Sequence, residues 1–233
     1  MKLRLRCPVS QAEEEAIRDS LGEPISYAPD QVLVRRGELL NSSILLLDGM
    51  LARYKDLSDG QRQIMHVHVP GDFADLHGYT LKRLDHNVMA LTRARIVRAP
   101  HVALDSLIDR FPRVGHIFWL TTNLDAAIHR EWEVSLGRRN AIERVANLFC
   151  ELHARLAVVG LTEGNRFRLP ITQAQLAECL GLTSVHVNRV LRELRESKLA
   201  EFRSGAVTIH DHKRLAALAE FDPQYLYLGP ISG

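Results

Sequence analysis

The stretch TQAQLAECLGLTSVHVNRVLRELR, residues 172–195, decides the fold of the C-terminal part of the chain. It predicts two short helices joined by a tight turn. Ala177 is small enough to let the helices touch, and Gly181 can adopt the positive φ that the turn requires. Thr183 or Ser184 then caps the second helix. Four apolar residues are expected to pack between the two helices: Leu176, Leu180, Val187 and Val190.

The outward face of the second helix, expected over residues 183–195, predicts contact with double-stranded DNA. Its side chains are short or basic, and groups of this kind reach base edges or phosphates when a helix lies in a major groove. They are Ser184, Val185, His186, Asn188, Arg189 and Arg192. An ordinary helical hairpin without a DNA-binding role is the alternative.

The composition is typical of a soluble globular protein with room for two modest domains. The chain has 233 residues, of which 46% are hydrophobic and 25% charged, and a net charge of +2. It has no run of eighteen apolar residues, and MKLRLRCPVSQAEEE lacks the apolar core of a signal peptide. We therefore expect a cytoplasmic protein that does not enter a membrane. The cysteines Cys7, Cys150 and Cys179 form no CxxC pair, which favours buried thiols.

The region from Ile25 to about Pro100 predicts an all-β roll of the double-stranded β-helix or jelly-roll type. Turn signals such as Asp48-Gly49 recur every ten to twelve residues or so between runs rich in β-formers. In residues 64–69 successive side chains point to opposite faces of the strand, and we expect the face with the methionine and the two valines to be the core. That face carries Met65, Val67 and Val69; the other carries Ile64, His66 and His68.

Residues 111–136 predict one long helix that pairs with a second copy of the chain. Six positions step alternately by three and four residues, and five of the six are apolar. They are Ile117, Leu120, Leu124, Ala127, Glu131 and Val134. A long helix has few faces to bury against its own chain, so we expect a symmetric homodimer. Packing of this helix on its own roll is the alternative.

The remaining residues predict a winged helix-turn-helix. Gly137 interrupts the long helix, and Asn140 is placed to cap the next one. After residue 195, two short β-rich runs flank Arg203-Ser204-Gly205, which predicts a hairpin, or wing. The expected fold is therefore α+β, in three parts: a roll over 1–110, a dimerisation helix over 111–136 and a winged helix-turn-helix over 137–233.

This order of parts resembles the Crp/Fnr family of bacterial transcription regulators. The resemblance covers nearly the whole chain and is carried by PGDF at the end of the roll, LGRRNAIERVANLFCEL after the long helix, and TQAQLAECLGLTSVHVNRVLRELRESKLAEF. It implies a homodimer that binds a palindromic DNA site, with RNA polymerase as a partner.

The resemblance also implies an effector pocket in the roll. Members that bind cyclic AMP carry a Gly-Glu-Leu-type turn followed by Arg-Ser-Ala or Arg-Thr-Ala, whose arginine pairs with the phosphate. Here Gly71-Asp72-Phe73 stands at the turn, but Leu84-Asp85-His86 replaces the triplet. An apolar residue and an acid cannot replace that arginine at a buried phosphate. Lys82 and Arg83 lie nearby, so an anion of another shape remains open, and we leave the effector unassigned.

The family's recognition helix often reads Glu-x-x-Ser-Arg or Glu-x-x-Gly-Arg. The resemblance implies that Arg189 contacts guanine O6 and N7, whereas Val185 stands in place of the glutamate and changes the half-site. Phosphate contacts that set the register are implied for Thr172, Gln173 and Thr183.

No cofactor, metal site or enzymatic activity is expected. His66 and His68 share one face of a strand, but with eleven histidines in the chain such a pair is a common coincidence. The iron–sulfur branch of the family carries clustered N-terminal cysteines, whereas only Cys7 is present here. No nucleophile elbow, P-loop or catalytic carboxylate pair occurs.

Three alternatives to a ligand-responsive DNA-binding regulator stay open. One is a regulatory module that binds a ligand without binding DNA. Another is an enzyme that uses the roll as a cupin-like metal site. The third is a redox-responsive regulator, because oxidation of Cys179 inside the first helix of the DNA-binding pair would alter that helix's packing.

Overall fold

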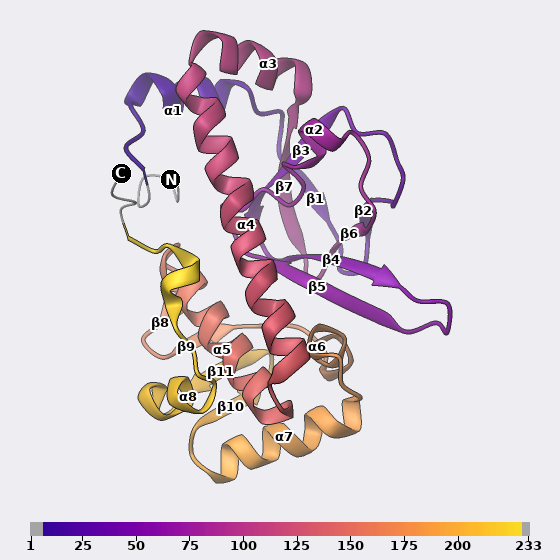
Figure 1. Ribbon diagram of the computed structural model, residues 1–233, viewed down its shortest axis with the longest axis vertical. Coiled ribbons are helices and arrows are strands. Elements are labelled where there is room, and N and C mark those ends of the chain that lie inside the picture. The colour runs from indigo at the N-terminus through magenta and orange to yellow at the C-terminus, as the bar shows by residue number, and fades with distance from the viewer. Residues whose placement is uncertain (1–6, 230–233) are drawn as a thin grey trace. The chain divides into compact units, whose positions relative to one another are not determined.

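The computed structural model describes residues 7–229 (Figure 1). They fall into two compact units. Residues 7–55, 67–127 and 227–229 belong to the first, called the roll unit here. Residues 56–66 and 128–226 belong to the second, called the winged-helix unit. The long helix is divided between the units after residue 127, and the domain boundaries expected at 110 and 136 stay a prediction.

The β-roll expected from the turn spacing is confirmed, with its strands arranged in two sheets (Figure 1). One sheet has the order β1-β7-β3 and the other β2-β6-β4-β5, and the central strands β7 and β6 pair with both neighbours antiparallel. Aliphatic residues such as Ile44, Leu51 and Val88 form the core of these strands. The strands are β1 (Ile25–Tyr27), β2 (Val32–Val34), β3 (Ser42–Asp48), β4 (Leu51–Asp56), β5 (Arg62–His68), β6 (Asn87–Ala90) and β7 (Ala94–Pro100).

Strand β5 differs from the expectation of one buried and one open face. Val67 and Val69 are buried as expected, but Ile64 is 0% exposed and His66 only 1%, whereas Met65 is partly exposed. The expectation that this face is the core therefore holds for Val67 and Val69 but is wrong for Met65, and the opposite face is buried as well. Alternation of apolar and polar residues separates the faces of a strand, but it does not reveal that a histidine face is also covered.

The long helix is confirmed as α4 (Pro112–Arg138), which starts at a proline, a residue suited to the first turn of a helix. The expected interruption at Gly137 is wrong, because the helix continues through Gly137 to Arg138. Its first turns pack within the roll unit, where Val114 and Phe118 join Phe73 and Leu104 in a second hydrophobic cluster. Three shorter helices complete the helical part of this unit: α1 (Gln11–Asp19), α2 (Gly78–Leu81) and α3 (His101–Arg110). Among the residues that the structure describes, no helix has the length and apolar character needed to cross a membrane.

The winged-helix unit begins its own helices at α5 (Ala141–Ala157). The predicted cap is present, because the side chain of Asn140 accepts hydrogen bonds from the backbone N–H groups of Ile142 and Glu143. The other helices are α6 (Gln173–Leu180), α7 (Ser184–Glu196), α8 (His212–Leu218) and the 3-10 turn η2 (Pro223–Leu226).

The predicted wing is confirmed as β10 (Ala200–Arg203) and β11 (Ala206–Ile209), which pair antiparallel. Ser204 and Gly205 between them have φ values of 51° and 69°, as a two-residue turn of the mirror-image type requires. The sequence did not predict that the hairpin extends into a four-stranded sheet of order β10-β11-β9-β8. The added strands are β8 (Thr162–Glu163) and β9 (Arg166–Arg168).

Candidate nucleic-acid interface

Helices α6 and α7 form the helix-turn-helix that the sequence predicts. Gly181 ends α6 with φ 61° and ψ 40°, and its N–H donates to the carbonyl of Ala177. Ala177 is 3% exposed, so a larger side chain would push the two helices apart. The inner residues are buried as expected, since Leu176, Leu180, Val187 and Val190 are all at most 4% exposed.

Threonine hydroxyls start both helices. The side chain of Thr172 accepts from the N–H of Gln175, and the Gln175 side chain accepts in return from the Thr172 N–H at 2.9 Å. At α7, Thr183 is the cap, and its hydroxyl accepts from the N–H of His186 at 3.2 Å. Helix α7 therefore begins with fixed geometry and its positive dipole end at the surface.

The outward face of α7 is open to solvent. Val185 is 82% exposed, Ser184, Asn188 and Arg189 are exposed, and His186 is partly covered. The Arg189 guanidinium donates from Nη2 to His186 Nε2 at 2.6 Å, which turns it toward the start of the helix. Thr172 and Gln173 of the first helix are exposed as well. Arg192 is exposed too, so the nine side chains expected to contact DNA all lie on one unit.

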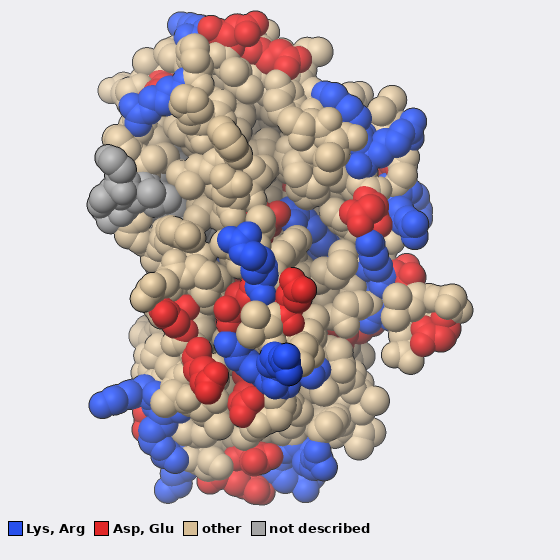
Figure 2. Space-filling view, viewed as in Figure 1, with Lys and Arg blue, Asp and Glu red and all other residues tan. Residues whose placement is uncertain are grey.

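Charge on this surface is mixed. Arg192 and Arg195 follow Arg189 along α7, but Glu193 and Glu196 lie between and after them. Figure 2 shows acidic and basic side chains next to one another along the lower edge of the view, where α7 runs in Figure 1. A mixed surface attracts any polyanion weakly, so the bulk charge of this surface does not by itself supply tight binding.

Strand β9 adds arginines that the sequence analysis missed. Arg168 lies opposite Ala206, which in turn lies opposite Arg203, so the pairing register places both arginines on one face of the sheet. Arg166 lies two residues before Arg168 on the same face, and all three arginines are exposed. Phe167, between Arg166 and Arg168, is 2% exposed and faces the core. The Arg-Phe-Arg alternation was a signal that could have identified this strand.

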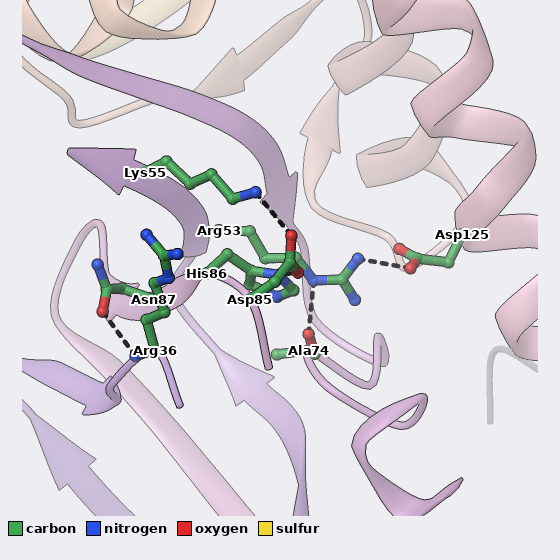
Figure 3. A network of polar contacts seen from close by, with 8 residues as sticks. All are labelled: Arg36, Arg53, Lys55, Ala74, Asp85, His86, Asn87 and Asp125. Atoms are coloured by element: carbon green, nitrogen blue, oxygen red, sulfur yellow. Dashed lines mark hydrogen bonds and ion pairs between the residues drawn. The ribbon is translucent and has the colours of Figure 1, made fainter. Parts of the chain in front are cut away.

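The roll unit contains a buried ion pair that the sequence did not indicate (Figure 3). Arg53 of β4 contacts Asp125 of α4 at 2.5 Å between Nη1 and Oδ2, and it donates from Nε to the carbonyl of Ala74 at 2.8 Å. The arginine side chain is 2% exposed and the aspartate 19%. A guanidinium at this depth requires compensation of its charge, which Asp125 supplies within the same unit.

A second carboxylate, Asp75, is fully buried in the roll unit. Its Oδ1 accepts from the Ile44 N–H at 2.6 Å, whereas its Oδ2 has no hydrogen-bond partner among the described residues. Burial raises the pKa of Asp75 to about 7, against the smaller lowering effects of the Ile44 hydrogen bond and the Arg53 charge.

The segment that replaces the cyclic-phosphate triplet has three different environments. Leu84 is 3% exposed and belongs to the core of the roll. Asp85 has 74% of its side chain exposed and pairs with Lys55 at 2.6 Å and with His86 Nδ1 at 2.8 Å (Figure 3). Hydrogen bonds from Lys55 and His86 hold the pKa of Asp85 well below its usual range, and burial lowers the pKa of His86. The expectation that Asp85 faces a buried anion site is therefore wrong, because its carboxylate points to solvent and Lys55.

The five candidate pocket residues lie in two places. Gly71 has φ 86° in the turn after β5, Asp72 Oδ2 accepts from the Val69 N–H at 2.9 Å, and Phe73 packs its ring 5.9 Å from that of Phe118. Lys82 and Arg83 follow α2 on the surface. Lys82 lies over the Tyr79 ring, and Arg83 donates to the Gly37 carbonyl.

The six residues expected at a dimer interface are unequally available. Ile117, Leu124 and Ala127 are 3%, 8% and 4% exposed within the single chain, Leu120 and Glu131 are partly exposed, and Val134 is 48% exposed. The buried three have little surface left for a second copy, because the long helix already packs that side against its own chain.

Both cysteines in helices of the winged-helix unit are buried. Cys150 is 0% exposed and burial raises its pKa to about 12; Cys179 is 2% exposed and its pKa is raised by burial and then by the Glu178 charge. Oxidation requires an accessible thiolate, so this environment disfavours a redox role for Cys179.

Comparisons with known proteins agree with this geometry. Residues 24–111 match the family model of the cyclic nucleotide-binding domain, and residues 143–218 match that of the Crp-like helix-turn-helix domain. Over 218 residues the chain is 28% identical to the transcriptional activator protein FnrL of Cereibacter sphaeroides, which covers 91% of this chain and 86% of that protein. Over 203 residues it is 29% identical to the transcriptional activatory protein AadR of Rhodopseudomonas palustris, covering 86% and 83%. The solved structure of FixK2 from Bradyrhizobium japonicum has the same fold, with a TM-score of 0.74, 24% identity, and coverage of 84% of this chain and 96% of that one.

A cyclic-nucleotide-type roll, a long helix and a winged helix-turn-helix with an open recognition face define a DNA-binding transcription regulator. The chain belongs to the Crp/Fnr family. The members of this family are transcription regulators, which are generally not enzymes.

Proposed function

We propose that this regulator binds a palindromic DNA site as a homodimer, with the first turns of α7 in the major groove of each half-site. It acts in the cytoplasm with RNA polymerase as a partner and responds to a signal other than cyclic AMP. The observation that carries the proposal is the division of α7 into a buried face, closed by Val187 and Val190, and an exposed face that holds Arg189.

Sequence readout is assigned to the exposed face of α7. Arg189 donates two parallel hydrogen bonds to guanine O6 and N7, the commonest specific contact in the major groove. Val185, 82% exposed, has no hydrogen-bonding group and fits a thymine methyl. Ser184, His186 and Asn188 lie around these two and can contact base edges or the backbone.

Register on the DNA is assigned to residues at the starts of the two helices. The Thr183 hydroxyl accepts from a backbone N–H, and its own proton remains able to donate to a phosphate oxygen. Thr172 and Gln173 occupy the equivalent place on α6, and Arg168 and Arg203 can reach the backbone from the wing sheet.

The second copy of the chain is placed along the exposed stripe of α4. Trp119, 67% exposed, lies on a line of open side chains that repeats every three or four residues. The stripe consists of His116, Trp119, Asn123, Ala126, Arg130 and Glu133, with Val134 beside its end. An exposed tryptophan on such a stripe favours a partner surface. Of the residues expected from spacing, Leu120, Glu131 and Val134 retain surface that can border this interface.

A signal other than cyclic AMP is proposed from the polar groups of the roll. Leu84 belongs to the core and Asp85 is paired with Lys55, so neither supplies the missing cation. Arg53 is the only fully buried arginine among the described residues of the roll unit, and its charge is compensated by Asp125. A cyclic phosphate would have to displace Asp125 or bind without a cation, and either is costly in a buried site.

The proposal is tested by selecting bound sequences from random double-stranded DNA with purified full-length protein. We expect an enriched palindrome whose half-sites share one guanine position and whose recovery depends on protein dimers. An enriched sequence without two-fold symmetry would refute the homodimer on a palindrome, and no enrichment with or without cell extract would refute sequence-specific binding.

A further inference from the structure

A buried carboxylate in the winged-helix unit accepts hydrogen bonds from side chains in distant parts of the chain. Glu151 of α5 is 0% exposed. It accepts from Arg155 Nη1 at 2.8 Å, from Trp132 Nε1 at 3.1 and 3.2 Å, and from the Tyr225 hydroxyl at 2.9 Å. Each side-chain donor has a fixed place in the fold: Arg155 one turn further along α5, Trp132 on α4, and Tyr225 on η2.

Arg155 extends this cluster to the β5 strand. It is 1% exposed and donates from Nη2 to His66 Nε2 at 3.1 Å. The His66 ring is stacked 6.2 Å from Trp132 and lies edge-on to His129 at 5.0 Å between ring centroids. Every member belongs to the winged-helix unit.

Several residues of the cluster around Glu151 and Arg155 lie next to the points where the chain enters or leaves this unit. The chain passes between the two units at four points, after residues 55, 66, 127 and 226. His66 is the last residue before one crossing, His129 is the second residue after another, and Tyr225 is the second residue before a third. Three of the four crossings therefore adjoin one buried ion pair.

We propose that Glu151 and Arg155 are positioning residues that hold these three connecting segments to α5. Helix α5 in turn packs against α6 and α7. A shift of β5, α4 or η2 at the crossings is thereby passed through α5 to the recognition helix. Because a buried ion pair with fixed donors has few alternative arrangements, it transmits a displacement instead of absorbing it.

This inference rests on the proposed function only for its effect on DNA, and its structural part can be tested without DNA. The probe is Tyr225→Phe, which removes one hydroxyl donor and keeps the ring. Trp132→Phe removes the indole donor from another segment. Tyr79→Phe is the matched control, because it also removes a hydroxyl-to-carboxylate hydrogen bond, to Asp105, but within the roll unit.

The measurement is hydrogen–deuterium exchange of full-length protein without DNA. We expect residues 62–66, 128–132 and 223–226 to exchange about tenfold faster together in Tyr225→Phe and again in Trp132→Phe, as the loss of a hydrogen bond to a charged group implies. The Tyr79→Phe control should leave all three segments unchanged. Faster exchange confined to the segment that carries each substitution, or no change, would overturn the joint role.

Specific DNA affinity then tests the coupling to α7. We expect both probe variants to lose about tenfold in affinity for the selected site while α6 and α7 keep wild-type exchange rates. If all three segments exchanged faster while the affinity for the selected DNA site stayed unchanged, the positioning role would be overturned. Failure of the wild-type protein itself to bind DNA would refute the proposed function. The exchange pattern tests independently whether Glu151 and Arg155 hold the three connecting segments together.

Discussion

Arg53 and Asp125 form an ion pair whose two members are buried to different depths, the arginine side chain 2% exposed and the aspartate 19%. Water can reach the carboxylate but barely reaches the guanidinium. The cost of losing one partner therefore depends on which of the two is left behind.

Removing the anion should destabilise the roll unit more than removing the cation. Asp125→Leu leaves a buried guanidinium without this carboxylate and should cost about 3–5 kcal/mol, whereas Arg53→Met leaves a partly hydrated carboxylate and should cost about 1–2 kcal/mol. Urea unfolding of both variants and of the double variant measures the difference. The double variant should approach wild-type stability, and equal costs for the two single changes would contradict this account.

The stability of the roll unit should depend on pH through Asp75. Its pKa is raised to about 7, so between roughly pH 4 and pH 7 the folded chain keeps a proton that the unfolded chain has released. The contribution is favourable below about pH 4 and is lost as the pH rises through 7, by up to about 4 kcal/mol. Asp75→Asn keeps an oxygen for the Ile44 N–H, so it should remove this dependence and be more stable than wild type at pH 8. If the free energies of unfolding of wild type and Asp75→Asn changed in parallel from pH 4 to 8, Asp75 would not be the source of the pH dependence.

Arg189→Ala should reduce specific DNA binding by about 1–3 kcal/mol and flatten the preference at one position of each half-site. Non-specific binding should change little, because one lost guanine contact does not alter the phosphate contacts. Titration of selected and scrambled sequences measures both. Arg195→Ala, near the C-terminal end of α7, serves as the control for loss of charge. If Arg189→Ala kept the wild-type base preference at every position of the site, Arg189 would not read a base.

The exposed stripe of α4 should be required for dimer formation. Trp119→Glu with Ala126→Glu places two acids on a surface that is open in the single chain, so folding should persist while dimers dissociate. Sedimentation measures the change in mass, and circular dichroism verifies the fold. Leu124→Asp, at a position 8% exposed, should instead unfold the chain. A dimer unchanged by the double substitution would place the interface elsewhere.

Cyclic AMP and cyclic GMP should bind very weakly, and neither should be needed for DNA binding. The physical reason is that Arg53, the buried arginine in the described part of the roll unit, is already engaged by Asp125. Isothermal titration with each nucleotide is the direct measurement. Micromolar binding coupled to tighter DNA association would refute the expectation, and Lys82 or Arg83 would then be tested as the phosphate contact.

Local patterns made much of the helix-turn-helix predictable. Gly181, the caps Asn140 and Thr183, and the turn Ser204-Gly205 each depend on interactions within a few residues, which the sequence displays directly. The roll was predictable as a class from its turns, but not the covering of both faces of β5.

Long-range contacts were not predictable in this way. Arg53 and Asp125 lie 72 residues apart, and nothing in the local sequence of either marks a partner. The Arg-Phe-Arg alternation of Arg166–Arg168 marks a strand, but it does not reveal that this strand pairs with β11. Helix α4 also carries two parallel stripes at the same spacing, so periodicity alone could not tell the roll-facing Ile117 from the solvent-facing Trp119.

The assignment of residues 56–66 to the winged-helix unit limits how this protein can be dissected. A C-terminal fragment that starts at residue 128 lacks His66, and Arg155 would then meet solvent in place of an imidazole. Domain exchange with another member of the family encounters the same obstacle at a single cut in α4. A transplantable module must carry the β4–β5 hairpin tip along with helices α5 to α8, although the two lie far apart in the sequence.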